Sequence, residues 1–295
     1  MKVTIPEDLK QDLPQTPWGK ILSVTPVVMT VVATLLAGLA SSEMTRAQYD
    51  RALGAQLQSK AGDQWGYFQA KKLRGAMQRT SLDLLRASAE IGPIDAARLG
   101  GGAGPAVVAA LQTGVLPEVG TGAPVEAPIA AAMAAVEGYR PETEISGMLA
   151  QVPAGALAEA LAIARRRGGE FDAVTKPVND AIDRIEGSIP ADDKALRRDV
   201  SFGRIRYAAA RYDAEARLNQ TVANLLELQV RKSNISAERH HRRSGSFFFG
   251  MLGAQAAVII STFAVAARKR NFLWTVAACA GVTAVAFAIY VYVRL

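Results

Sequence analysis

The sequence predicts an all-α membrane protein with three transmembrane helices, an elongated helical hairpin or coiled coil outside the membrane, and a small helical insert. Three observations support this fold class: long uncharged apolar runs near the start and at the end of the chain, helical periodicity in the segments beside them, and almost no strand-like alternation. The net charge is +7 and half of the residues are hydrophobic. Because the charges avoid the apolar runs, the pattern argues against a wholly soluble protein, and three buried core helices are the alternative.

Three segments are long enough to cross a bilayer as helices. Ile21–Ser42, Ser244–Ala267 and Asn271–Val293 contain no Asp, Glu, Lys or Arg. A hydrocarbon core of about 30 Å requires roughly 20 helical residues, because each residue adds about 1.5 Å. Small residues near Ala40 resemble a signal-peptidase site, but acidic residues before the first run favour an uncleaved anchor over a cleaved signal peptide.

The chain divides by composition into seven segments. They are an N-terminal tail, a first span, a long stalk helix, an insert rich in Gly, Ala and Pro, a second long helix and two closing spans, at residues 1–18, 19–42, 43–90, 91–190, 191–243, 244–267 and 271–293. Within the insert we expect short helices at about 105–113, 124–138, 153–167 and 172–187, bounded by Gly or Pro. A flexible insert is the alternative.

The orientation in the membrane depends on basic residues. Arg268, Lys269 and Arg270 form the short loop between the last two spans, and short basic loops stay in the cytoplasm. This loop predicts that the middle region is periplasmic. The reverse orientation is favoured by Arg239, Arg242 and Arg243, which lie on the opposite side of the second span.

The stalk helix carries the candidate interface. We expect its apolar stripe to advance mostly in steps of four through Leu53, Leu57, Ala61, Trp65, Phe68, Lys72 and Ala76. Several sides of this helix carry residues that are favoured in contacts, and we predict an interface made of Trp65, Tyr67, Phe68, Gln69 and Lys71. Gly62 and Gly66, four residues apart, would allow close approach of a partner. An ordinary core within the hairpin remains the alternative.

The second long helix has a seam interrupted by a stutter. Leu196, Val200 and Tyr207 belong to the first part of the seam, and Val222 to the second. Charged residues, Glu215 among them, are expected on the solvated outer face.

No group of residues has the spacing of a catalytic or cofactor site. The glycine run at 100–104 lacks the Lys and Ser or Thr of a phosphate-binding loop. His240 and His241 are adjacent, so their side chains point about 100° apart on a helix and do not meet at one ion. Cys279 is the only cysteine. We therefore predict no enzyme activity, no cofactor and no metal site within one subunit, and we do not expect nucleic acid as a partner.

Two segments resemble a known family. Gln64–Lys72, with the sequence QWGYFQAKK, and Arg268–Trp274, with the sequence RKRNFLW, are similar to the bacterial domain-of-unknown-function family 4337. The resemblance covers about 50 residues at each end of the chain. It implies an N-terminal anchor, a C-terminal two-helix membrane hairpin and assembly, and it implies no reaction.

These observations predict a non-enzymatic integral membrane protein that self-associates through its helical stalk as a scaffold or accessory subunit. Its expected partners are membrane lipid and further copies of the chain, and a larger membrane complex is a further candidate. An oligomeric channel or a membrane-remodelling assembly is the alternative function.

Overall fold

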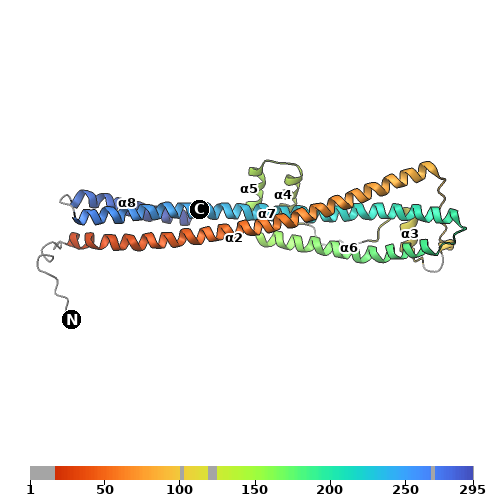
Figure 1. The fold of residues 1–295 in the computed structure, drawn as a ribbon, viewed down its shortest axis with the longest axis horizontal. Coiled ribbons are helices and arrows are strands. Elements are labelled where there is room, and N and C mark those ends of the chain that lie inside the picture. Colours follow the sequence, from red (N-terminus) through yellow and green to blue (C-terminus); the bar gives the residue numbers. More distant parts are fainter. Residues whose placement is uncertain (1–16, 100–102, 119–124, 267–269, 295) are drawn as a thin grey trace, which may run out of the picture. The chain divides into compact units, whose positions relative to one another are not determined.

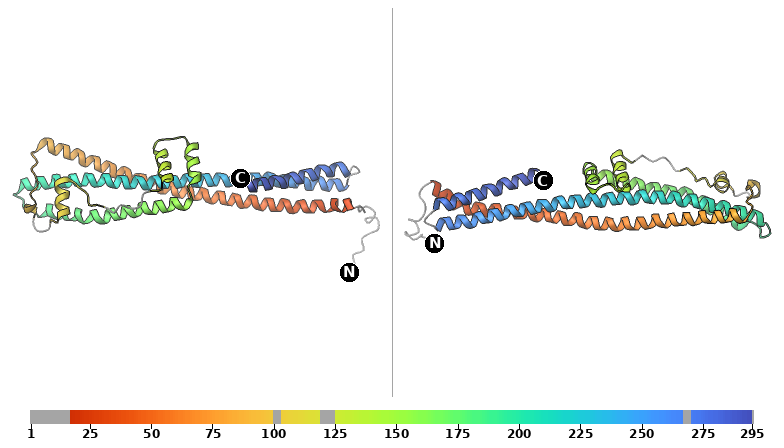
Figure 2. Two further views of the ribbon diagram at one scale, coloured as in Figure 1. Left: turned by 180° about the vertical axis from the view of Figure 1, so that it is seen from behind. Right: turned by 90° about the horizontal axis from the view of Figure 1, so that it is seen from above.

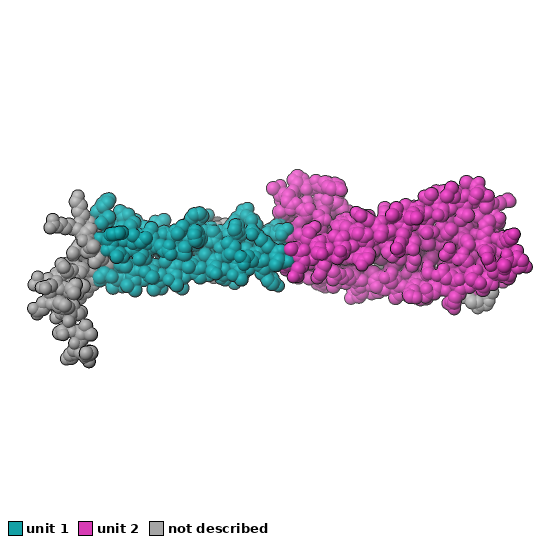
Figure 3. All heavy atoms as spheres, viewed as in Figure 1, with its two compact units in different colours: residues 1–52, 233–295 teal, residues 53–232 magenta. Residues whose placement is uncertain are grey.

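The computed structural model describes residues 17–99, 103–118, 125–266 and 270–294. In this part of the chain there are seven α-helices, α2 to α8, one short 3-10 helix, η1 (Ala96–Leu99), and no strand (Figure 1). The all-α class is therefore confirmed. The chain forms two compact units, which Figure 3 colours separately: unit 1 holds residues 1–52 and 233–295, and unit 2 holds residues 53–232.

Three helices are long and apolar enough to cross a membrane, as predicted. Helix α2 (Pro17–Ser88) includes the first span and continues into the stalk segment, α7 (Lys194–Ala266) includes the second long helix and the second span, and α8 (Arg270–Arg294) is the third. Helices α5 (Glu142–Gln151) and α6 (Ala154–Ser188) meet at 95° and would supply a fourth only if both formed one bent span.

The core of unit 1 consists of small and apolar side chains from α2, α7 and α8. Its buried members are Ala33, Leu36, Ala40, Phe247, Ala254, Ala284 and Val291. The Ser244 hydroxyl donates a buried hydrogen bond of 2.8 Å to the Ala40 carbonyl oxygen and so joins α7 to α2. Many large apolar side chains of these helices point outward, among them Val27, Leu35, Phe249, Phe263 and Val282. Such a surface suits hydrocarbon, which needs no polar partner.

In unit 2, α7 is the central helix. It shares a core with α3 (Pro105–Thr113) and α6, and α6 lies beside it in both views of Figure 2. A second cluster joins α7 to α2 through Leu82, Phe202 and Ala209. Because α7 has neighbours on several sides, every residue from 222 to 230 is buried or half-buried.

The start of α7 and the end of α3 are fixed by side chains. Asp193 caps α7 by accepting a hydrogen bond of 3.1 Å from the Leu196 backbone N–H, and this bond lowers the pKa of the Asp193 carboxyl. The Arg206 guanidinium donates to the Leu111 carbonyl oxygen at the end of α3, at 2.7 Å. Burial, with a further contribution from Arg86, lowers the pKa of Arg206.

The insert is more regular than the sequence predicts. The helices expected at 153–167 and 172–187 are one continuous helix, α6, which passes through Gly168, Gly169 and Pro177. Its buried residues Ala164, Phe171, Thr175 and Val178 keep helical spacing across the glycine pair, so tertiary packing overrides the weak local propensity. Helix α5, which was not predicted, pairs with α4 (Ala127–Glu137) in a hairpin whose helices run across α7 (Figure 1).

Candidate functional site

The predicted interface segment, residues 62–71 of α2, lies in unit 2, and its side chains occupy two faces. Trp65 and Phe68 are half-buried against helices of the same chain, and their rings make an edge-to-face contact with centroids 5.4 Å apart. The exposed members are Gly62, Gly66, Tyr67 and Gln69. A Cβ atom added at either glycine would meet nothing within 4 Å. The first group therefore packs within the subunit, and the second faces outward.

Lys71 belongs to the inward group and makes an ion pair with Glu215 of α7. Glu215 was expected on the solvated face of α7, and this expectation is wrong: the residue is only 6% exposed, because α2 covers that face. Arg211 Nη1 lies 3.6 Å from the same carboxylate, and the Lys71 ammonium lies 5.5 Å from the centre of the Tyr212 ring. Two cations thus neutralise one buried acid.

The inner stripe of α2 advances in alternating steps of three and four residues. In unit 2 it consists of Ala61, Gln64, Phe68, Lys71, Gly75, Gln78, Leu82 and Leu85, all buried or half-buried. The predicted stripe, in steps of four, is correct as far as Phe68 and wrong beyond it, because Lys72 and Ala76 are exposed. Lys71 and Gly75 take their places against α7.

A second stripe runs along the opposite, exposed face of α2. We call it the outer stripe, and it consists of Gly66, Ala70, Leu73, Met77, Thr80, Leu84 and Ala87, all exposed. Its steps alternate between four and three, the spacing of a coiled-coil seam. Leu73, Met77 and Leu84 are 63%, 58% and 66% exposed. Large apolar side chains this open are unusual along one face of a helix outside the membrane.

A pocket of about 530 Å³ opens beside Trp65 and Phe68. Helix α7 and the α4–α5 hairpin supply the rest of its lining, which includes Glu137, Tyr139 and Asn224. Asn224 is only 2% exposed, and its Nδ2 donates to Glu137 Oε1 at 2.5 Å. The Asn224 Oδ1 atom is buried and accepts no hydrogen bond.

The turn between α4 and α5 holds Tyr139 in a left-handed conformation, with φ of 52°. The Arg140 N–H bonds to the Ala135 carbonyl oxygen at 3.0 Å, and the Tyr139 N–H bonds to the Val136 carbonyl oxygen at 3.1 Å. This pattern is a Schellman motif, in which glycine is the favoured residue at the position that Tyr139 occupies. The ring is 95% exposed and lines the pocket. A costly backbone conformation thus presents an aromatic ring at the pocket's edge.

The guanidinium groups at this pocket are already paired. Arg231 bonds to both Glu142 and Glu227, and Arg140 Nη1 lies 2.6 Å from Glu144. Burial is the largest influence on the Arg231 pKa and lowers it, but the bonds to its two carboxylates outweigh burial and raise the pKa overall. Arg231 therefore stays charged and committed to its partners.

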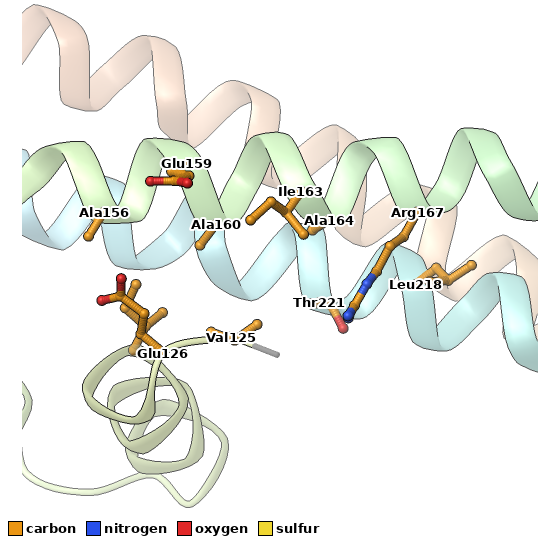
Figure 4. Close-up of a pocket in the computed structure, with 11 residues that line it drawn as sticks. Val125, Glu126, Ala156, Glu159, Ala160, Ile163, Ala164, Arg167, Leu218 and Thr221 are labelled. Carbon is orange, nitrogen blue, oxygen red and sulfur yellow. The ribbon is translucent and has the colours of Figure 1, made fainter. Parts of the chain in front are cut away.

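A smaller pocket of about 210 Å³ lies between the start of α4, α6 and α7 (Figure 4). Ala160, Ile163 and Ala164 line its middle, and the carboxylates of Glu126 and Glu159 lie toward one end in Figure 4. Its lining is mainly apolar, without the converging polar groups of a catalytic site.

Unit 1 contains a polar cluster beside the spans, around His240. No three His, Cys, Asp or Glu residues in the described ranges are arranged to hold a metal ion. His240 instead contacts Glu43, while Arg46 and Arg243 lie 3.6 and 3.9 Å from that carboxylate. Of the predicted topology determinants, Arg268 and Lys269 lie outside the described residues, and Arg270 is the first residue of α8.

Sequence reasoning missed the residues that form the larger pocket with Trp65. Glu137, Tyr139 and Asn224 are far apart in the chain, and only the α4–α5 hairpin and α7 bring them together. One local signal was present: Gly138 and Pro141 bracket a turn at the point where α4 ends.

Comparison with known protein families gives a match over the N-terminal third of the chain. Residues 18–99 match a family model described as "Domain of unknown function (DUF4337)". No curated protein and no solved structure matches the chain. The matched segment contains α2 from Trp18 onward, including Trp65, Phe68 and the outer stripe, whereas the resemblance noted at Arg268–Trp274 lies outside it and stays a prediction. The match covers less than a third of the chain, and it shows that residues 18–99 are similar to the DUF4337 domain.

Proposed function

We propose that this protein is a non-enzymatic membrane scaffold or accessory subunit that self-associates through the outer stripe of α2. The observation that carries the proposal is the exposure of Leu73, Met77 and Leu84 on one face of a helix whose opposite face is already packed. Fully burying one such side chain stabilises a complex by about 1.5–3 kcal/mol. Several such side chains per copy provide a driving force for association.

A second copy of the chain is the partner that best fits this stripe. Its seven-residue repeat matches the seam of a two-stranded coiled coil, and two copies anchored with the same topology have parallel α2 helices. Gly66 and Ala70 would let the two backbones approach closely at one end of the seam. Tyr67 and Gln69 are two exposed residues of the predicted interface, and they would lie at the edges of this seam.

The membrane location supports this role. With three candidate spans, the chain is suited to lie in a bilayer as a multi-pass protein in contact with lipid. The family resemblance favours the bacterial inner membrane, and the basic residues between the last two spans favour a middle region in the periplasm. A larger membrane complex is a further partner that such a scaffold would organise.

The decisive experiment compares the mass of the extracted full-length protein with that of stripe variants. The double variant Leu73→Gln with Met77→Gln should dissociate the assembly at concentrations where the unmodified protein remains oligomeric, as measured by mass photometry in native lipid discs. Val115→Gln is the matched control, because Val115 is 59% exposed and lies outside α2. A monomeric unmodified protein, or a double variant that remains fully assembled, would overturn the proposal.

Cross-linking tests the register of the two copies. In a Cys279→Ser background, oxidation should join two copies through Leu73→Cys or Met77→Cys, since like seam positions meet in a parallel pair. Lys72→Cys, which is exposed beside the stripe, should cross-link far less. If Lys72→Cys forms the stronger cross-link, the seam is misassigned. An assembly that conducts ions in planar bilayers would favour the channel alternative over a scaffold.

A further inference from the structure

We infer that the pocket beside Trp65 and Phe68 binds a small organic cation, namely a primary or secondary ammonium group attached to an apolar or aromatic body. The pocket belongs to unit 2 and lies on the opposite side of α2 from the outer stripe, so the inference does not depend on self-association. Its volume of about 530 Å³ is within the usual range for small-molecule sites.

The first observation is an unused acceptor. Asn224 is 98% buried, and its Oδ1 has no hydrogen-bond partner. The orientation of the amide is fixed, because Nδ2 donates to Glu137 Oε1 at 2.5 Å and a flipped amide would bring two acceptors together. A buried acceptor without a partner is costly, and a small movement of Asn224 toward the pocket on ligand binding would let a ligand N–H satisfy it.

The second observation is the unbalanced charge of Glu137. Its Oε1 accepts hydrogen bonds from Asn224 and from Gln220 Nε2, at 2.5 and 3.2 Å, but within the described residues no Lys, Arg or His forms an ion pair with it. The nearby Arg140 and Arg231 are engaged by other carboxylates. The pocket therefore contains a carboxylate without a cationic partner, hydrogen-bonded to Asn224.

The third observation is aromatic lining. Three aromatic residues, Trp65, Phe68 and Tyr139, are among those that line the pocket, and aromatic faces attract cations. The left-handed conformation of Tyr139 holds one of these rings at the edge of the pocket. An ammonium group at Glu137 and Asn224 would place its apolar body among these rings. Because Glu137 is exposed, water screens its charge, and we expect a dissociation constant on the order of 10⁻⁴ M.

Three probes of similar shape test the ligand class. Saturation-transfer NMR on the full chain in detergent, corrected with protein-free micelles, measures phenethylammonium, 2-phenylethanol and phenylacetate. We expect saturable binding of phenethylammonium, at least about tenfold weaker binding of the alcohol, and none of the carboxylate. Equal binding of the alcohol, stronger binding of phenylacetate, or no saturable binding up to about 10 mM would overturn the inference.

Variants locate the site. Glu137→Gln keeps the shape of the side chain and should weaken phenethylammonium binding about five- to tenfold. Asn224→Leu should weaken it similarly without leaving a new unpaired polar atom. Glu159→Gln is the matched control, because Glu159 is exposed in α6 and does not line this pocket. If Glu137→Gln and Asn224→Leu both bind as the unmodified protein does, with circular dichroism confirming that they are folded, the ligand lies elsewhere and the inference fails.

Discussion

His240 Nδ1 lies 2.5 Å from Glu43 Oε2, a contact that joins α7 to α2 in unit 1. Glu43 is only 9% exposed, and the second ring nitrogen of His240 lies 4.0 Å from Asp50 Oδ2. A carboxylate this buried needs its partners, because an unpaired buried charge is strongly destabilising. The contact is thus a fixed point between the two helices next to their apolar segments.

We predict that this pair couples energetically. Glu43→Gln and His240→Gln should each lower the apparent melting temperature of the full chain in detergent. Combining them should lower it by less than the sum of the single effects, with a coupling of about 1 kcal/mol. Circular dichroism at 222 nm measures the transitions. The matched pair Glu238 and Arg242, exposed on α7 with 2.8 Å between Oε1 and Nε, should show much smaller coupling. Equal coupling in the two pairs would contradict the prediction.

A second prediction concerns the close approach of α3 to α7. A Cβ atom added at Gly203 would lie 2.5 Å from the Leu111 carbonyl oxygen and 3.0 Å from Ile94 Cδ1. Gly203→Ala must therefore push α3 away from α7, and we expect it to destabilise unit 2 by about 1–3 kcal/mol.

Gly168→Ala is the control for this substitution. Gly168 lies inside α6, and a Cβ atom there would meet nothing within 4 Å. Since alanine favours the helix over glycine, this variant should be stabilised by about 0.5–1 kcal/mol. Thermal unfolding of the two variants should shift in opposite directions from the unmodified protein. Shifts of the same sign would show that the packing at Gly203 has been misjudged.

The fold class could be predicted because membrane spans and long helices have strong signals in sequence. The apolar runs fall within α2, α7 and α8 as expected, apart from Ala267, which lies outside the described residues. The error at Gly168–Gly169 has a physical cause: local propensity predicts a break, whereas the buried face of α6 continues across it. The burial of Glu215 was missed for a related reason, since its partner Lys71 lies on another helix and no local pattern links them.

The candidate site was only partly predictable. Trp65 and Phe68 were identified because an aromatic pair on a polar helix is conspicuous, but their partners in the pocket come from the insert. The outer stripe was missed because Lys72 and Ala76 were assigned to the packed face. After Phe68 the prediction continued to Lys72, whereas the packed residue is Lys71. This difference of one residue turns the predicted packed face by about 100° around the helix, so Leu73 and Met77 were not recognised as part of one exposed face.

Tyr207 leads to a prediction about alkaline stability. Its side chain is 1% exposed, and its hydroxyl donates to the Thr175 carbonyl oxygen at 3.3 Å. Burial raises the pKa of Tyr207 above its ordinary value of 10.0. The folded state therefore resists deprotonation more than the unfolded state does. Its stabilising contribution is complete below pH 10 and is lost as the pH rises from there through the folded-state pKa.

Tyr207→Phe should make unfolding less sensitive to alkali. At neutral pH it should lower stability by about 1 kcal/mol, because the hydrogen bond to Thr175 is lost. Above about pH 10 the difference from the unmodified protein should shrink, since the variant has no phenol to ionise at that site. Melting temperatures measured between neutral and alkaline pH test this. Tyr67→Phe, at an exposed position, should run parallel to the unmodified protein. If the melting temperature of Tyr207→Phe falls with pH in parallel with that of the unmodified protein, the raised pKa assigned to Tyr207 is contradicted.

The last prediction tests the proposed orientation. Thr143 is exposed in α5, within the middle region, so Thr143→Cys in a Cys279→Ser background presents one accessible thiol. If the basic loop Arg268–Arg270 is cytoplasmic, a membrane-impermeant maleimide added to spheroplasts should label this cysteine before lysis. Thr4→Cys, before the first span, should be labelled only after lysis. The opposite pattern would mean that Arg242 and Arg243 determine the orientation and that unit 2 lies in the cytoplasm. A cytoplasmic unit 2 would expose the outer stripe and the pocket beside Trp65 to cytoplasmic partners and amines instead of periplasmic ones.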